Sequence, residues 1–350
     1  MRTTTFQIAD RVVGQGHSPF VIAELSANHN GDIERAFAIM KAARDAGADA
    51  VKLQTYTADT MTIDHDSDEF RIHGGLWDGR RLYELYQEAQ TPWAWHEALF
   101  DKARDLGLIA FSSPFDESAV DFLESLGAPA YKIASFELID TPLIRYAAKT
   151  GKPLILSTGM ATDAEIGEAI SVAQEAGAGG VALLHCVSGY PTPAEEANLA
   201  RIPALAEKFN CAIGLSDHSP GVAVAIAGAA LGAAIIEKHF TLARADGGPD
   251  AAFSLEPDEL AALVKGVGTA HSALGRADYG RAASEQLNMA FRRSLYAVKD
   301  IAAGEELTGE NVRSIRPGYG LAPKHLPEIL GRRAPRAIAR GTPMSFDILE

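Results

Sequence analysis

Two histidines end two successive apolar runs in the last third of the chain. His218 closes the segment Gly-Leu-Ser-Asp-His, and His239 closes Ile-Ile-Glu-Lys-His. If these runs are neighbouring parallel strands, both imidazoles lie on one rim, where their carboxyl ends meet. Two imidazoles leave open coordination positions, as is typical of a metal acting as a Lewis acid. The pattern predicts a divalent-metal site; for each ring the alternative is a packed imidazole that holds a backbone carbonyl.

Lysines and hydroxyls mark the ends of other apolar runs. Lys52 and Lys132 each stand alone in such a run, and burying a lone cation is costly unless an anion compensates it. Lysine supplies charge and hydroxyls supply directed donors, so the set suits a small phosphorylated anion. A strand-end serine taken alone is more often a turn or capping residue. The hydroxyl residues at these ends are Ser112, Ser113, Ser135, Ser157, Ser188, Tyr190 and Ser216.

Two glutamates occupy similar positions. Glu24 ends an apolar run, and Glu137 lies just beyond another. At the mouth of a barrel a carboxylate can act as an acid, a base or a clamp on a sugar hydroxyl. The alternative is a salt bridge to Lys52 or Lys132.

Short apolar runs alternate with amphipathic helical segments between residues 19 and 275. Eight strand–helix units in about 250 residues match a (β/α)8 TIM barrel, and nearly continuous apolar strands are typical of a parallel sheet covered on both faces. The rival is a doubly wound open sheet, which would normally carry a glycine-rich phosphate turn after its first strand. Asp32 starts a predicted helix that Gly47 ends, and Thr162 with Glu165 has capping-box spacing. The predicted strands are residues 20–26, 49–55, 109–113, 130–135, 153–158, 181–187, 211–216 and 234–240.

Two segments fall outside this repeat. Residues 1–18 are predicted to form a hairpin that plugs the base of the barrel, and the barrel itself spans residues 19–276. A polar linker, residues 277–290, leads to residues 291–350, whose short strand-like runs and turn signals predict a small β-rich domain. The long loop at residues 56–90 is predicted to be a lid or a substrate wall, because long loops after barrel strands lie at the active face.

The formal charge of −14 disfavours nucleic acid or an anionic membrane as a partner. Residues 291–350 hold ten Lys and Arg against seven Asp and Glu, so +3 there leaves −17 on residues 1–290. This asymmetry suggests that the tail docks on the body of the same or another subunit; ordinary variation in surface composition is the alternative. Cys186 and Cys211 are interpreted as buried apolar residues in a reducing compartment. The start lacks the apolar stretch of a secretion signal, so a cytoplasmic location is expected.

With these residues placed, the chain resembles the sialic acid synthase family, and within it the pseudaminic acid synthase branch. The shared motifs run through nearly the whole sequence and are specific when taken together. They are IAELSANHNG (22–31), VKLQTY (51–56), SSPF (112–115), YKIASFE (131–137), STGM (157–160), YPT (190–192), GLSDH (214–218), EKHF (237–240) and GPD (248–250). The tail, residues 291–350, similarly resembles the antifreeze-like (SAF) domain that is appended to these synthases, on motifs that lie between residues 293 and 318.

The resemblance implies that the protein condenses phosphoenolpyruvate with an acetamido sugar to give a nine-carbon 2-keto acid and phosphate. It implies that His218 and His239 hold Mn2+ or Mg2+, and that Glu24 and Glu137 are further catalytic groups. In the family the C-terminal domain crosses a dimer and brings an arginine to the partner's barrel. Arg316 matches that arginine, which implies a domain-swapped homodimer. The residues implied for phosphoenolpyruvate are Lys52, Ser113, Lys132, Ser135, Ser157, Ser188 and Ser216, and those for the sugar are Gln54, Phe115, Tyr190, Asp250 and Arg316.

One departure bears on the sugar. N-acetylneuraminate synthases place asparagine where this chain has Ser188, whereas the segments LSA (25–27) and GLWD (75–78) agree with the pseudaminic branch. The implied substrate is therefore 2,4-diacetamido-2,4,6-trideoxy-altropyranose. The alternative is synthesis of N-acetylneuraminate or legionaminate from N-acetylmannosamine or a related diacetamido sugar.

Two other classes of function remain open. A metal aldolase, or a synthase that uses a phosphorylated aldose, would need a second phosphate cradle, and the sequence shows no clear one outside the tail arginines. An ice-binding role for the tail requires a flat, weakly charged face, against which its ten Lys and Arg argue.

Overall fold

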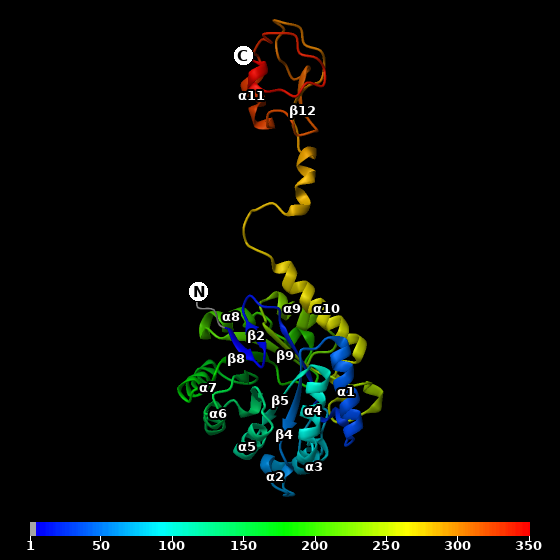
Figure 1. Cartoon of the computed structure of the whole chain (residues 1–350), viewed down its shortest axis with the longest axis vertical. Coiled ribbons are helices and arrows are strands. Elements are labelled where there is room, and N and C mark those ends of the chain that lie inside the picture. The colour runs from blue at the N-terminus through cyan, green and yellow to red at the C-terminus, as the bar shows by residue number, and fades with distance from the viewer. Residues whose placement is uncertain (1–4) are drawn as a thin grey trace. The chain divides into compact units, whose positions relative to one another are not determined.

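Figure 1 shows the computed structural model, which describes residues 5–350 of the chain. Its contacts divide the chain into two units that separate between Gly275 and Arg276. Residues 1–4, the start of the predicted N-terminal hairpin segment, lie outside the described part. No helix in the described part is long and apolar enough to cross a bilayer.

The first unit is built on a closed barrel of parallel strands, in the order β10-β3-β4-β5-β6-β7-β8-β9. Each strand pairs with the next one along the chain, and β10 closes the barrel by pairing with both β9 and β3. The predicted (β/α)8 barrel is therefore confirmed. The strands are β3 (Phe20–Glu24), β4 (Ala50–Thr55), β5 (Ile109–Pro114), β6 (Tyr131–Ile133), β7 (Leu154–Ser157), β8 (Val181–Cys186), β9 (Ala212–Asp217) and β10 (Ile235–His239).

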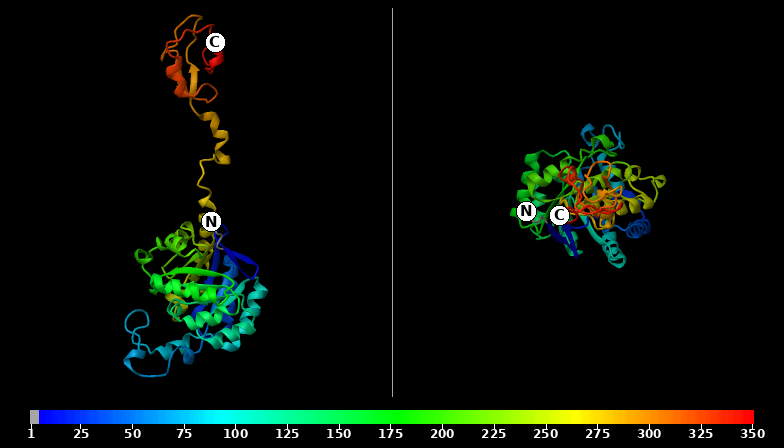
Figure 2. Two further views of the ribbon diagram at one scale, coloured as in Figure 1. Left: turned by 90° about the vertical axis from the view of Figure 1, so that its left-hand side faces the viewer. Right: turned by 90° about the horizontal axis from the view of Figure 1, so that it is seen from above.

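Helices surround these strands (Figures 1 and 2). The local sequence determines where these helices begin and end. At the start of α1 (Ile33–Ala46) the Asp32 side chain accepts a hydrogen bond from the Glu34 N–H, and Gly47, with φ 91°, ends the same helix. Thr162 and Glu165 form the predicted capping box. The helices are α1 (Ile33–Ala46), α4 (His96–Leu106), α5 (Glu117–Ser125), α6 (Thr141–Ala148), α7 (Asp163–Glu175), α8 (Arg201–Phe209), α9 (Ala223–Ala230) and α10 (Pro257–Leu274).

The segment of residues 56–90, predicted as a lid, leaves the barrel after β4 (Figure 2, left). It contains two short helices, α2 (Ala58–Met61) and α3 (Leu82–Ala89).

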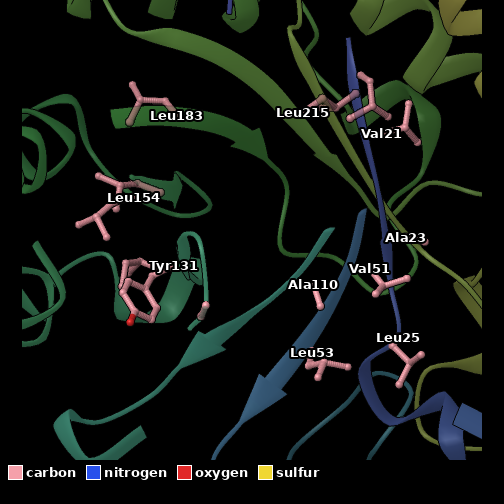
Figure 3. Packing of buried hydrophobic residues seen from close by; sticks show 14 of the residues in the cluster. Val21, Ala23, Leu25, Val51, Leu53, Ala110, Tyr131, Leu154, Leu183 and Leu215 are labelled. Atoms are coloured by element: carbon pink, nitrogen blue, oxygen red, sulfur yellow. The ribbon is translucent and has the colours of Figure 1, made fainter. Parts of the chain in front are cut away.

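Side chains of the strands alternate between two apolar clusters. Val21 and Ala23 of β3 pack outward against the helices (Figure 3), whereas Phe20 and Ile22 of the same strand belong to a separate inner cluster. This alternation determines which polar residues near the strand ends face the interior.

An antiparallel hairpin precedes the barrel, formed by β1 (Thr5–Ile8) and β2 (Arg11–Gly14). Ile8 and Val13 are buried in the inner cluster together with Phe20 and Ala50, which lie at the amino ends of their strands. Apolar side chains of the hairpin thus pack against the base of the barrel interior.

The second unit has its own apolar cluster, which includes Leu295, Ile301 and Ile338. Around it lie an antiparallel pair, β11 (Ser294–Ala297) and β12 (Val312–Ile315), and the short helix α11 (Leu326–Ile329). The segment predicted as a polar linker contains 3-10 turns at Ala283–Glu285 and Leu287–Phe291.

Candidate active site

Alternation along the strands directs one set of polar side chains into the carboxyl end of the barrel. In β10, Ile235 belongs to the inner cluster, so Glu237 and His239, two and four residues further on, face the same way. The same two-residue alternation, counted from the inner-cluster residue of each strand, applies to the other strands. The residues that it places at the barrel mouth are Glu24, Lys52, Gln54, Ser113, Lys132, Ser157, Ser216, Glu237 and His239.

Four buried charged side chains meet in this mouth. Lys52 Nζ lies 2.5 Å from Glu24 Oε2 and 3.8 Å from Glu237 Oε2. Lys132 Nζ lies 2.9 Å from Glu237 Oε1, and the Ser216 hydroxyl donates to the same oxygen over 2.9 Å. Glu237 is therefore an internal anion between two lysines.

Burial affects the two carboxyl groups differently. It raises the pKa of Glu24 to about 7, because the cost of desolvation exceeds the attraction of Lys52. Burial also acts to raise the pKa of Glu237, but Lys132 and Lys52 together outweigh it and lower that pKa to about 2. Glu24 can therefore change its protonation near neutral pH, whereas Glu237 stays ionised.

Glu237 is the site residue that the sequence analysis missed. Lys52 and Lys132 were expected to need a bound anion, but Glu24 and Glu237 already compensate their charge. Burial of these lysines is therefore not by itself evidence for an anionic ligand. The salt bridge considered as the alternative role for Glu24 is present. A signal for Glu237 existed, since it precedes His239 by two residues and so shares its face of the strand.

The two histidines do converge. The ring centroids of His218 and His239 are 5.4 Å apart. His218 Nδ1 lies 3.0 Å from the Val187 carbonyl oxygen, which leaves its Nε2 for another partner. His239 Nδ1 is buried without a hydrogen-bond partner, and burial lowers the pKa of this ring well below its usual value, so it is held neutral as a metal ligand must be.

These features fit an open divalent-metal site. Within residues 5–350 no three or more His, Cys, Asp and Glu side chains are grouped to hold an ion. Any metal held by the two histidines would therefore need further ligands from water or a substrate.

Serine hydroxyls cluster beside the lysines. Lys52 Nζ is 3.4 Å from Ser113 Oγ, and Ser135 Oγ accepts the Gly159 N–H over 3.2 Å. Ser157 Oγ and Ser188 Oγ are buried without hydrogen-bond partners. A β-carbon at Gly159 would overlap the hydroxyls of Ser135 and Ser188, so glycine is needed there for this close approach.

A cavity of about 560 Å³ opens above this cluster. One part of its wall is polar and includes Gln54, Glu137, Ser188, His239 and Asp250. The rest is mainly apolar or aromatic. Much of it comes from the predicted lid, including Met61, Ile72, Leu76, Trp77, Leu82 and Leu85, and Phe115, Phe136 and Tyr190 are among the residues that line it from elsewhere.

Several contacts fix this wall. The Trp77 indole N–H donates to the Pro249 carbonyl over 3.0 Å, so the predicted lid is joined to the segment that carries Asp250. The Tyr190 and His218 rings are in contact, with centroids 4.4 Å apart and planes tilted by 41°. The Ser26 hydroxyl donates to Asp250.

Glu137 is a candidate proton-transfer group. Burial raises its pKa to about 7, and its Oε2 is buried without a hydrogen-bond partner. It lines the same cavity as Gln54 and Asp250. A carboxyl group of this kind can exchange a proton with a bound hydroxyl near neutral pH.

Arg316 belongs to the second unit. Its side chain is exposed there and lines a hollow of about 500 Å³. Phe291, Arg292 and Arg293 line the same hollow and are exposed too. Arg316 is therefore the one predicted site residue that does not lie in the barrel unit.

Comparison with known proteins identifies the family. Residues 39–279 match the NeuB family and residues 292–350 match the SAF domain. A pseudaminic acid synthase of Campylobacter jejuni is 48% identical over 322 residues, which cover 92% of this chain and 94% of that protein. One of Helicobacter pylori is 46% identical over 334 residues, covering 95% and 98%. The crystal structure of an N-acetylneuraminic acid synthetase from Leptospira borgpetersenii aligns with a TM-score of 0.74 and 32% identity, over 82% of this chain and 95% of that one. As its motifs predicted, the chain belongs to the NeuB family of sialic acid synthases and carries a C-terminal SAF domain.

Proposed function

We propose that this chain condenses phosphoenolpyruvate with the open-chain aldehyde of 2,4-diacetamido-2,4,6-trideoxy-altropyranose to give a nine-carbon 2-keto acid and phosphate. One observation carries the proposal: two lysines, a serine cluster and two histidines converge beside a cavity with a large apolar wall. The extensive identity to two pseudaminic acid synthases supports the same reaction.

Phosphoenolpyruvate binds among the lysines and serines. The hydroxyls of Ser157 and Ser188 have no partner and can donate to phosphate or carboxylate oxygens. Lys52 and Lys132 supply positive charge that attracts both the ligand and Glu237. The other hydroxyls of this set are those of Ser113, Ser135 and Ser216.

His218 and His239 hold the divalent cation, Mn2+ or Mg2+. When bound there, the ion supplies Lewis-acid polarisation of the sugar aldehyde. The sequence positions of these histidines at neighbouring strand ends and the unpartnered Nδ1 of His239 support this assignment.

Bond formation begins when carbon 3 of the enol attacks the aldehyde carbon, whose oxygen takes up a proton. Water then adds at carbon 2 and loses a proton; the hydroxyl so formed gives its remaining proton to the departing phosphate as the C–O bond breaks, which leaves the 2-ketone. Glu24, with its pKa near 7, orders this water and accepts its proton. Glu137, in the cavity wall, hydrogen-bonds the sugar hydroxyls.

The sugar lies in the cavity, against Gln54, Phe115, Tyr190 and Asp250. Arg316 reaches it from the partner subunit of a domain-swapped homodimer. In this arrangement residues 1–18 form the plug, 19–276 the catalytic barrel, 277–290 the linker and 291–350 the SAF domain.

Product analysis tests the reaction. Purified protein with Mn2+ and phosphoenolpyruvate is offered the diacetamido altrose-type sugar, a related diacetamido sugar and N-acetylmannosamine, and products are identified by mass spectrometry. We expect efficient conversion of the first sugar only. Preferential use of N-acetylmannosamine or of the other diacetamido sugar would instead assign the chain to N-acetylneuraminate or legionaminate synthesis.

A further inference from the structure

A further buried ion pair, separate from those of Lys52 and Lys132, lies behind the two histidines. Asp217 of β9 and Lys238 of β10 are direct partners in the parallel ladder. Lys238 Nζ lies 3.0 Å from Asp217 Oδ2, and their side chains are 0% and 3% exposed. Because strand side chains alternate, this pair faces the helical layer, whereas Glu237 and His239 face the barrel interior.

The pair also holds the turn that presents His218. Asp217 Oδ1 accepts the Ser219 N–H over 2.8 Å, and Lys238 Nζ donates to the Ser219 carbonyl oxygen. Both backbone groups of Ser219 are thus held from behind, directly after His218. The same two strands are joined on the inner face by the bond from Ser216 to Glu237.

The register of β9 and β10 is therefore held on both faces, by residues one and two positions before His218 and His239. A single cation bound by both rings would require two nitrogen ligands at about 2 Å, and such geometry tolerates displacements of only about 0.5 Å. The separation of the two rings depends on the relative placement of these strand ends.

Stability alone does not account for this pair. Burying two charges costs desolvation energy, and apolar residues of similar volume are often equally or more stabilising. Unlike apolar packing, this ion pair makes directional contacts, which fix the Ser219 backbone and the register of β9 and β10. We propose that Asp217 and Lys238 are positioning residues that set the separation and orientation of His218 and His239 for one divalent cation. The inference rests on the metal site of the proposed function.

The test compares metal affinity with stability. The double substitution Asp217→Leu with Lys238→Met removes the contacts without leaving a buried charge unpaired. Mn2+ binding is measured on the apoprotein by electron paramagnetic resonance, and Co2+ binding by its visible absorption. Outer residues that orient metal ligands typically affect affinity by about 10–100-fold, so we expect the Kd for Mn2+ to rise by that factor and the Co2+ spectrum to change. Because Ser219 is buried and its N–H and carbonyl lose these partners, the melting temperature should also fall, so the Kd is compared with that of a control variant that loses stability elsewhere in the barrel.

Asp49→Leu, which removes the acceptor of the Val21 N–H, is the matched control. Asp49 also sits at a strand end in an ion pair, 3.4 Å from Arg11 Nε, and it accepts the Val21 N–H over 2.8 Å, but at the opposite end of the barrel. We expect this variant to lose stability and to keep the wild-type Kd for Mn2+. If the double variant does not fold, Lys238→Arg keeps the charge with a different donor geometry, and its Kd should rise without loss of folding.

The outcomes distinguish a failure of the positioning role from a failure of the metal site. If Mn2+ binds the folded double variant, or Lys238→Arg where that variant replaces it, as tightly as it binds the wild type, the positioning role is refuted while the metal site stands. If the wild type does not bind Mn2+, or if His218→Ala leaves the affinity unchanged, the metal site itself is refuted, and the positioning role with it.

Discussion

The replacement of Glu237 by glutamine tests the electrostatics of the site most directly. Glutamine keeps the shape of the side chain but removes the anion between Lys52 and Lys132, which lie 3.8 Å and 2.9 Å from its oxygens. Glu24 then remains as the only carboxylate paired with these lysines in the described structure. The variant leaves positive charge buried without full compensation.

The expected loss of stability follows from the lowered pKa of Glu237. A pKa lowered from 4.5 to about 2 corresponds to about 3 kcal/mol that favours the ionised form in the folded state. Removal of one partner from a buried ion pair typically costs about 3–5 kcal/mol, in agreement with that value. For a domain of about 250 residues each kcal/mol lowers Tm by about 2–4 °C. We therefore expect the Tm of the barrel to fall by about 6–12 °C.

The assay is thermal unfolding at neutral pH, with and without phosphoenolpyruvate and without the sugar. The ligand should raise the Tm of Glu237→Gln more than that of the wild type, because its negative charge replaces the missing carboxylate. Asp45→Asn is the control: it removes an exposed carboxylate 2.5 Å from Lys41, and no measurable change is expected. A Tm within about 2 °C of the wild type, or an equal response to the ligand, would refute the assignment of Glu237 as the counterion of both lysines.

The other predictions address metal, sugar, acid stability and bond cleavage. His218→Ala and His239→Ala should each abolish turnover while circular dichroism shows an intact fold, and a chelator should have the same effect on the wild type; full activity in metal-free buffer would contradict this. Arg316→Ala should raise the KM of the sugar far more than that of phosphoenolpyruvate, and equal effects would place this arginine elsewhere. Burial lowers the pKa values of His29 and His96 to about 4, so both are neutral when folded, and the stability that they contribute above about pH 6.5 should be lost as the pH falls towards 4. The slope of Tm against pH in that window should be smaller for His96→Gln; an unchanged slope would contradict the assignment. Phosphoenolpyruvate labelled with 18O at the bridging oxygen should transfer its label to phosphate, whereas label in the keto acid would indicate P–O cleavage.

Much of the architecture was predictable from the sequence because its signals are local. Apolar runs separated by helical segments indicated the eight strands, and the end of each run showed which polar residues would reach the mouth. His218 and His239 could be assigned to one rim because their strands follow each other in the chain and pair directly. The Asp32 cap and the Thr162 capping box needed only a few neighbouring residues.

The charge balance of the site depended on the tertiary structure. Glu237 meets Lys132 from β6, a strand that is not its neighbour in the barrel, and Ser26 meets Asp250 across 224 positions of the sequence. The two-residue period of a strand specifies the face on which a side chain lies, but not its distance from side chains on distant strands. That distance is set by how the barrel closes. The sequence alone therefore indicated most polar residues of the mouth, including the two histidines, and only the closed barrel decided that Glu24 and Glu237 pair with the two lysines.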